Sequence, residues 1–226
     1  SATRKYKMKK KVKIFITKGI FLFCLFVIHM MADGIVLVKD IRPGADDSDP
    51  RYPTVFNGKV YFRANDGTTG KELWSSDGTE SGTTLVKNID GTNVDSLNIP
   101  FFYEYNNALY FIAEDSNGRE LWSTDGTESG TNMVKNIDGT TGDSFVEGED
   151  PYFVVFNNKL YFRASNPSNG EELYSTDGTS SGTTIVKDIT VGTSGSNTKY
   201  MTVFDSKIYF SANDATTNKG IELWSS

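Results

Sequence analysis

A unit of about 50 residues recurs along this chain, and this repeat limits the fold more than any other feature of the sequence. The segment Glu72–Thr79 returns at residues 120–127 and 172–179, and its first half returns at residues 222–226. The repeated glutamates lie 48, 52 and 50 residues apart. Because one such unit cannot bury its apolar face alone, the units must pack on one another.

Each unit is predicted to hold four short β-strands. An apolar hairpin comes first, and in the first unit its turn is Asn57-Gly58, a pair that favours a type I′ turn. The other units place Asn106-Asn107, Asn157-Asn158 and Asp205-Ser206 at this turn. The third strand carries the Glu-Leu-aromatic segment, and the fourth is an apolar run at residues 84–89, 133–137 and 185–189. No apolar period of 3.6 residues is sustained, so we expect almost no helix.

The fourth-strand motifs are offset by one unit relative to the first three strands of each repeat. The fourth-strand motif also occurs before the first hairpin, at residues 35–41, and the third strand at 222–224 is the last predicted one. This offset predicts an all-β fold, a four-bladed β-propeller of four-stranded blades whose last blade is closed by the N-terminal strand. The units span about 42–89, 90–137, 138–189 and 190–226, the last completed by 35–41. An open β-repeat array and a fragment of a larger propeller remain alternatives.

The first 32 residues differ in composition from the rest. They hold eight basic residues and no acidic one, and the apolar run 20–28 follows the cationic stretch. This pattern is typical of a secretory signal peptide, and nine apolar residues fall short of the roughly 20 that span a membrane. We therefore expect residues 33–226 to be a secreted or cell-surface β-propeller domain, with no stable membrane span. An uncleaved N-terminal anchor is the alternative.

The charge and the rare residue types exclude several functions. Of the 23 basic residues, eight lie in residues 1–32, which leaves 15 against 29 acidic residues and a net charge of −14 for the body. Such a body does not suit the phosphate backbone of nucleic acid. The one histidine, His29, and the one cysteine, Cys24, both lie in the N-terminal segment. A histidine-based catalytic triad, a histidine-ligated metal and a zinc site built on paired cysteines are thereby excluded from the body.

The repeated motif resembles a known family. Glu-Leu-Trp-x-x-Asp-Gly-Thr at residues 72–79, followed by Gly-Thr and a Leu-Val-Lys run, resembles the bacterial ELWxxDGT repeat family. The likeness extends over residues 35–226, with Tyr174 in the place of the motif's tryptophan. The resemblance implies a secreted or surface protein with a propeller-like fold, and it brings no catalytic residues to this chain.

Two sets of repeated residues are candidates for ligand or metal binding. One aromatic per unit could stack on sugar rings or, as we favour, pack between blades. One aspartate in each of the first three units could offer an oxygen to calcium, although turns between the third and fourth strands explain these residues better. The aromatics are Trp74, Trp122, Tyr174 and Trp224, and the aspartates are Asp77, Asp125 and Asp177.

The repeated glutamates are the remaining chemical candidates. Two carboxylates at a fixed separation could hydrolyse a glycosidic bond. We instead expect Glu72, Glu120, Glu172 and Glu222 to pair with a lysine of the neighbouring fourth strand, because a residue found in every unit has a structural role.

The sequence thus predicts a non-catalytic binding or interaction scaffold with no required cofactor, whose partner is an extracellular protein or glycan. A multivalent carbohydrate-binding propeller is one alternative. A surface or filament component that self-associates through its terminal strands is the other.

Overall fold

Every regular element in the described part of the chain is a β-strand. The computed structural model describes residues 34–217 and 219–226, and the predictions for residues 1–32 lie outside this part. The chain divides into two units, Ser1–Val36 and Leu37–Ser226, and the strands found in the described residues belong to the second. None of the described residues forms a helix long and apolar enough to cross a membrane.

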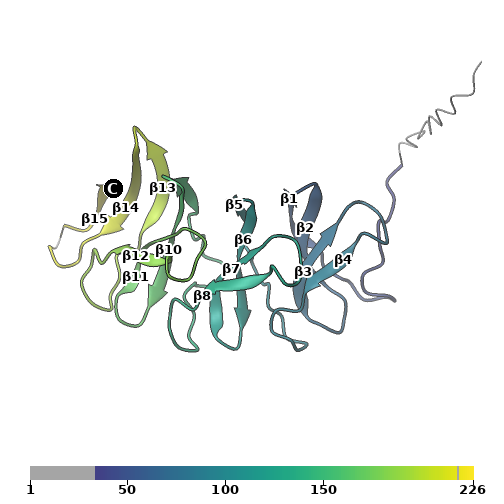
Figure 1. The fold of residues 1–226 in the computed structure, drawn as a ribbon. Helices are drawn as coiled ribbons and strands as arrows, with labels where there is room; N and C mark the ends of the chain where they lie inside the picture. The colour runs from purple at the N-terminus through teal and green to yellow at the C-terminus, as the bar shows by residue number, and fades with distance from the viewer. Residues whose placement is uncertain (1–33, 218) are drawn as a thin grey trace, which may run out of the picture. The chain divides into compact units, whose positions relative to one another are not determined.

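The strands form four antiparallel sheets in chain order, so the predicted repeat of β-sheets is confirmed (Figure 1). The first sheet holds β1 (Arg51–Phe56), β2 (Lys59–Asn65), β3 (Lys71–Ser76) and β4 (Thr84–Lys87). The second holds β5 (Tyr103–Tyr105), β6 (Ala108–Asp115), β7 (Gly118–Thr124) and β8 (Asn132–Lys135). The third holds β9 (Val154–Phe156), β10 (Lys159–Asn166), β11 (Gly170–Thr176) and β12 (Thr184–Lys187). The fourth holds three strands, β13 (Lys199–Phe204), β14 (Lys207–Asn213) and β15 (Ile221–Ser225).

The predicted turns join the first two strands of each sheet. Asn57 and Gly58 have φ angles of 46° and 72°, as a type I′ turn requires at both central positions. The corresponding residues of the other three turns also have positive φ. The fourth strands are shorter than predicted: β4 ends at Lys87 instead of residue 89. The chain turns there because the Ile89 N–H donates to the Glu72 carboxylate at 3.0 Å.

The predicted closure of the last sheet by residues 35–41 is not confirmed. In the described residues, β15 pairs with β14 alone, and residues 37–41 form no strand. The Lys39 ammonium instead donates to the Thr83 carbonyl of the first sheet at 2.8 Å. Lys87 donates in the same way to Thr131 of the second sheet, and Lys135 to Thr183 of the third. Residues 37–41 therefore take, beside the first sheet, the position that β4 takes beside the second.

The apolar core lies between consecutive sheets. Tyr61 and Leu73 of the first sheet pack with Phe111 and Trp122 of the second in one buried cluster. A second cluster joins the second and third sheets, and another joins the third and fourth. Neighbouring residues of one strand point to opposite faces, so Leu73 contributes to the junction with the second sheet while Trp74 packs beneath Ile41.

Candidate functional site

The repeated aromatics are buried between the sheets. Trp74, Trp122 and Tyr174 are only 6%, 5% and 4% exposed. Trp224 of the fourth sheet is partly buried; its indole N–H donates to the Ala212 carbonyl at 3.0 Å, and the Lys187 ammonium lies 5.8 Å from its ring centroid. A sugar ring cannot stack on the three buried side chains in this arrangement, which favours their packing role.

The repeated aspartates shape turns. Asp77 Oδ1 accepts hydrogen bonds from the Thr79 hydroxyl at 2.7 Å and the Thr79 N–H at 2.9 Å, and these bonds hold the pKa of Asp77 below its usual range. Asp125 and Asp177 make the same bonds with Thr127 and Thr179. Residues 34–217 and 219–226 contain no group of three or more His, Cys, Asp or Glu that could hold a metal ion. These bonds support the turn role that we favour, and calcium binding stays the alternative.

The repeated glutamates hold the loop that follows each fourth strand. Glu120 is fully buried, and its carboxylate accepts from the Ile137 N–H at 3.0 Å, the Asp138 N–H at 3.4 Å and the Ser144 hydroxyl at 2.6 Å. Glu172 repeats this arrangement with Ile189, Thr190 and Ser196. Burial raises the pKa of Glu120 to about 7 and that of Glu72 also to about 7. The Glu120 and Glu172 carboxylates are thus occupied by backbone N–H groups and a serine hydroxyl of the loop that follows the fourth strand of their own sheet.

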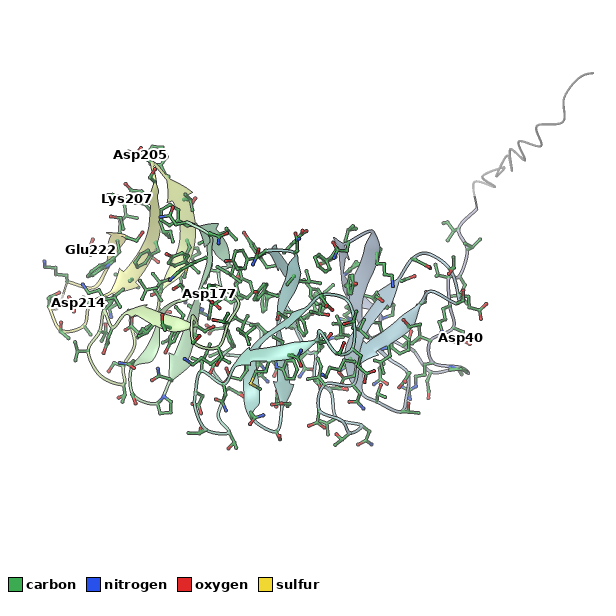
Figure 2. The ribbon with its side chains drawn as sticks, in the orientation of Figure 1. Asp40, Asp177, Asp205, Lys207, Asp214 and Glu222 are labelled. Carbon is green, nitrogen blue, oxygen red and sulfur yellow. The ribbon has the colours of Figure 1, made fainter. Side chains whose placement is uncertain are left out.

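The predicted pairing of these glutamates with lysines is wrong. Lys87 and Lys135 reach forward to a carbonyl of the next sheet, as Lys87 does to Thr131 at 2.7 Å, and Lys187 lies over the Trp224 ring. The physical reason is that unpaired backbone N–H groups at the end of each fourth strand are buried donors that need an acceptor, and the carboxylate supplies it. Glu222 lacks this environment and is exposed on β15 (Figure 2).

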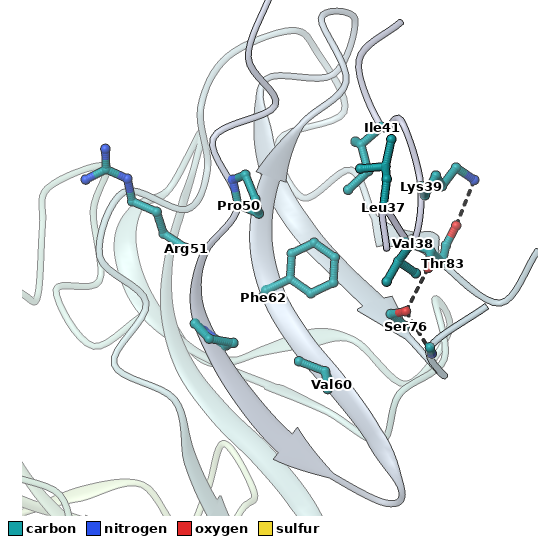
Figure 3. Close-up of a pocket in the computed structure, with 12 residues that line it drawn as sticks. Leu37, Val38, Lys39, Ile41, Pro50, Arg51, Val60, Phe62, Ser76 and Thr83 are labelled. Atoms are coloured by element: carbon teal, nitrogen blue, oxygen red, sulfur yellow. Dashed lines mark hydrogen bonds between the residues drawn. The ribbon is translucent and has the colours of Figure 1, made fainter. Parts of the chain in front are cut away.

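An apolar cavity opens on the first sheet and is one candidate for a binding surface. Its volume is about 480 Å³, and Figure 3 shows Leu37, Val38, Val60 and Phe62 on its walls. The Ser76 and Thr83 hydroxyls lie at its edge, 2.7 Å apart. Val60 is 37% exposed there, whereas the residues in the same position of the other sheets, Leu109, Leu160 and Ile208, are fully buried.

The glycine of each Asp-Gly-Thr segment shows what covers this surface in the other sheets. A Cβ on Gly126 would lie 2.2 Å from the Tyr61 hydroxyl, and one on Gly178 would lie 2.6 Å from the Tyr110 hydroxyl. Only glycine lets the preceding sheet's tyrosine approach so closely. Gly78 of the first sheet lines the cavity, and a Cβ there would meet nothing within 4 Å.

A second candidate surface, which was not predicted from the sequence, lies at the start of each hairpin. One aromatic per unit has a left-handed backbone, a conformation that costs a bulky residue about 1–3 kcal/mol and that often marks a functional site. A positive φ of 49° to 58° is shared by Tyr52, Phe101, Tyr152 and Tyr200. Each lies five residues before the hairpin turn, and this spacing is the signal that could have identified the set.

Three of these units contribute to an open groove of about 320 Å³. The centroids of Tyr103 and Phe153, both on the groove, are 5.7 Å apart, and the Tyr152 ring packs against Tyr200, whose centroid is 5.3 Å away. The lining residues are Phe101, Phe102, Tyr103, Asp150, Tyr152, Phe153 and Met201.

A buried arginine supports this groove from beneath. Arg163 is 4% exposed, and its guanidinium lies 5.5 Å from the Tyr152 ring centroid. It forms ion pairs with Glu149 and Glu171, the latter at 3.1 Å. Arg63 of the first sheet repeats the pattern with Asp49 and with Tyr52, whose ring centroid is 5.3 Å away. These contacts fix the positions of two of the left-handed tyrosines.

Comparison with known proteins identifies the kind of fold but no family. No family model and no curated protein matches the chain. A solved structure of a puromycin hydrolase variant is similar, with a TM-score of 0.50, 12% identity, and coverage of 78% of this chain and 27% of that one. This chain therefore spans about a quarter of that protein's length, and the likeness concerns the arrangement of sheets alone.

Two glycoside hydrolases also show similarity, at TM-scores too low to bear on function. An α-L-arabinofuranosidase from Clostridium thermocellum has a TM-score of 0.34 and 17% identity, covering 79% of this chain and 68% of that one. An endo-arabinanase from Bacillus licheniformis has a TM-score of 0.25 and 17% identity, covering 82% of this chain and 95% of that one.

Proposed function

We propose that this protein is an exported, non-catalytic interaction scaffold that binds a protein partner on the cavity face of its first sheet. One observation carries the proposal: the repeated polar residues are used within the sheets, whereas the face around Val60 keeps an apolar cavity of about 480 Å³. Apolar surface of this kind, rimmed by polar groups, is typical of interaction sites.

The use of the repeated carboxylates argues for binding over catalysis. Glu120 and Glu172 direct their oxygens at backbone N–H groups and a serine hydroxyl of the loop that follows their own sheet. A glycosidase needs two carboxyl groups that face a shared substrate. The export part of the proposal depends on the cationic stretch and the apolar run 20–28 of the sequence.

A photo-reactive amino acid tests this function directly. Placed at position 60, it should form a covalent adduct with a protein, because the cavity brings the partner within reach. Placed at Val191, which is exposed away from the cavity lining, it should form none. The absence of a protein adduct at position 60 would contradict the scaffold function.

Carbohydrate binding is a second candidate function, and the aromatic groove is the observation that favours it. Tyr152→Ala, at a ring on the groove, is expected to reduce the affinity for a bound polysaccharide at least tenfold while the melting temperature changes little. Val191→Asp is the matched control. A glycan screen of the purified chain with calcium present provides the ligand, and binding that is equal in Tyr152→Ala and the control would contradict this function.

A further inference from the structure

Each junction between consecutive sheets is built from the same parts. The earlier sheet supplies the aromatic pair of its hairpin, the leucine of its third strand, and aliphatic residues at its fourth strand. At the first junction these are Phe56, Tyr61, Leu73, Val86 and Ile89. There are two such aliphatic residues at the first and second junctions, whereas at the third junction Ile189 is buried and Val186 is 42% exposed. The later sheet supplies the face on which they pack, with Leu109, Phe111 and Trp122 at this junction.

Only some of these packing residues have a counterpart on the first sheet. Val38 and Ile41 stand in the positions of Val86 and Ile89, since Lys39 between them makes the bond that Lys87 makes at the next junction. Ile41 packs on the cluster of Phe62 and Trp74. The hairpin aromatics and the third-strand leucine have no counterpart among the described residues on this face, and the cavity lies where they would pack.

The fourth sheet exposes the hairpin aromatic and the third-strand leucine that have no counterpart on the first sheet. Phe204 and Leu223 are 69% and 75% exposed, while Phe56 and Leu73 in the same positions of the first sheet are 1% and 0% exposed. The hairpin pair is already formed: the ring centroids of Phe204 and Tyr209 are 6.2 Å apart, close to the 5.6 Å of Phe56 and Tyr61. Asp205, labelled in Figure 2, lies in the turn of this hairpin.

We propose that the partner of the cavity is the β13–β14 hairpin of a second copy of this chain. Phe204 and Tyr209 of one copy enter the cavity of the next, with the Tyr209 hydroxyl over Gly78 as Tyr61 lies over Gly126. Leu223 of the first copy then lies with Val38 and Ile41 of the second copy. Together these residues complete the set of packing residues that is found at the junctions within the chain. This inference rests on the proposed function and names its partner. The contact is head-to-tail, because two different surfaces of each copy meet.

Two complementary variants of the full chain test this geometry by sedimentation equilibrium. Val60→Asp blocks the cavity and leaves the hairpin intact, and Phe204→Asp blocks the hairpin and leaves the cavity intact. Each variant alone should sediment with the 25.0 kDa of one chain. An equimolar mixture should reach twice this mass, because one intact cavity then meets one intact hairpin. The apparent mass of the unmodified chain should rise with its concentration.

Several results would overturn the proposal. A mixture of the two variants that keeps the mass of one chain would do so. An unmodified chain that stays a monomer at all concentrations would also do so. That second result is expected if the two surfaces meet within one chain and close a ring. The double variant is the control, and its association would place the contact elsewhere. Pro53→Asp, at another exposed residue of the cavity, replaces Val60→Asp if that variant does not fold. An adduct from position 60 to a different protein would support the scaffold function and overturn this inference.

Discussion

Trp122→Ala is expected to lower the free energy of unfolding by about 3–5 kcal/mol, because it removes a large side chain from a closed junction. The indole is 5% exposed and packs with Phe56, Tyr61 and Phe111 in the cluster between the first two sheets. Urea unfolding followed by circular dichroism measures this loss. The same variant should bind a polysaccharide as the unmodified chain does wherever both are folded.

Trp224→Ala is the matched control for this prediction. It removes the same side chain from the same repeat position, but Trp224 is only partly buried and lies at the last sheet. Its loss of stability should be clearly smaller. If Trp122→Ala abolished glycan binding and left the melting temperature unchanged, the aromatics would be sugar-stacking residues and the packing interpretation would be wrong.

Glu120→Ala is expected to cost at least about 3 kcal/mol of stability, since it leaves several buried donors without an acceptor. The Ile137 N–H, the Asp138 N–H and the Ser144 hydroxyl all donate to this carboxylate. Glu222→Ala removes the exposed glutamate of the same repeat position and should change stability by no more than about 0.5 kcal/mol. Equal effects of the two substitutions would contradict the structural role of Glu120.

The pH dependence of stability follows from the same residue. Burial raises the pKa of Glu120 from 4.5 to about 7, so the folded chain keeps a proton that the unfolded chain has released within this window. Stability contributed by this group is therefore present below about pH 4.5 and is lost as the pH rises to about 7. In Glu120→Gln this loss should be absent, which makes the fall in stability between pH 4.5 and 7 smaller than in the unmodified chain. Parallel pH profiles would contradict the shift.

The local structure of each unit could be predicted from its sequence. Asn57-Gly58 fixes a type I′ turn between two apolar runs, and the register of the hairpin follows from that turn. The opposite faces of Leu73 and Trp74 follow from the alternation of side chains along a strand. Such features depend on residues that are close in the chain, which is why a single sequence contains them.

The position of residues 35–41 could not be predicted, because the repeat makes several positions equivalent. Their Val-Lys-x-Ile pattern is that of a fourth strand. It is compatible with packing against the first sheet, which has no preceding fourth strand, and equally with pairing at the edge of the last sheet. In the structure, Lys39 donates to the Thr83 carbonyl of the first sheet, and residues 37–41 pair with none of the described strands. The cavity around Val60 follows from this position and could not be predicted either.

The hydrogen-bond partners of the repeated glutamates and lysines could not be predicted from the sequence either. Glutamate and lysine on neighbouring strands suggest an ion pair, but Lys87 pairs in register with Leu73, and the backbone N–H of Ile89 just after β4 donates to the Glu72 carboxylate. The left-handed tyrosines were missed for a related reason: positive φ is expected at glycine or asparagine, and Tyr152 adopts it within a hydrogen-bonded turn to Asp150.

Photo-cross-linking from position 60 is the most direct test that the cavity face of the first sheet is a docking surface for protein. The expected result is an adduct whose cross-linked peptide includes the hairpin around Phe204, together with no adduct from position 191. If neither position gave an adduct, the cavity face would not be a docking surface, and the scaffold function would be contradicted.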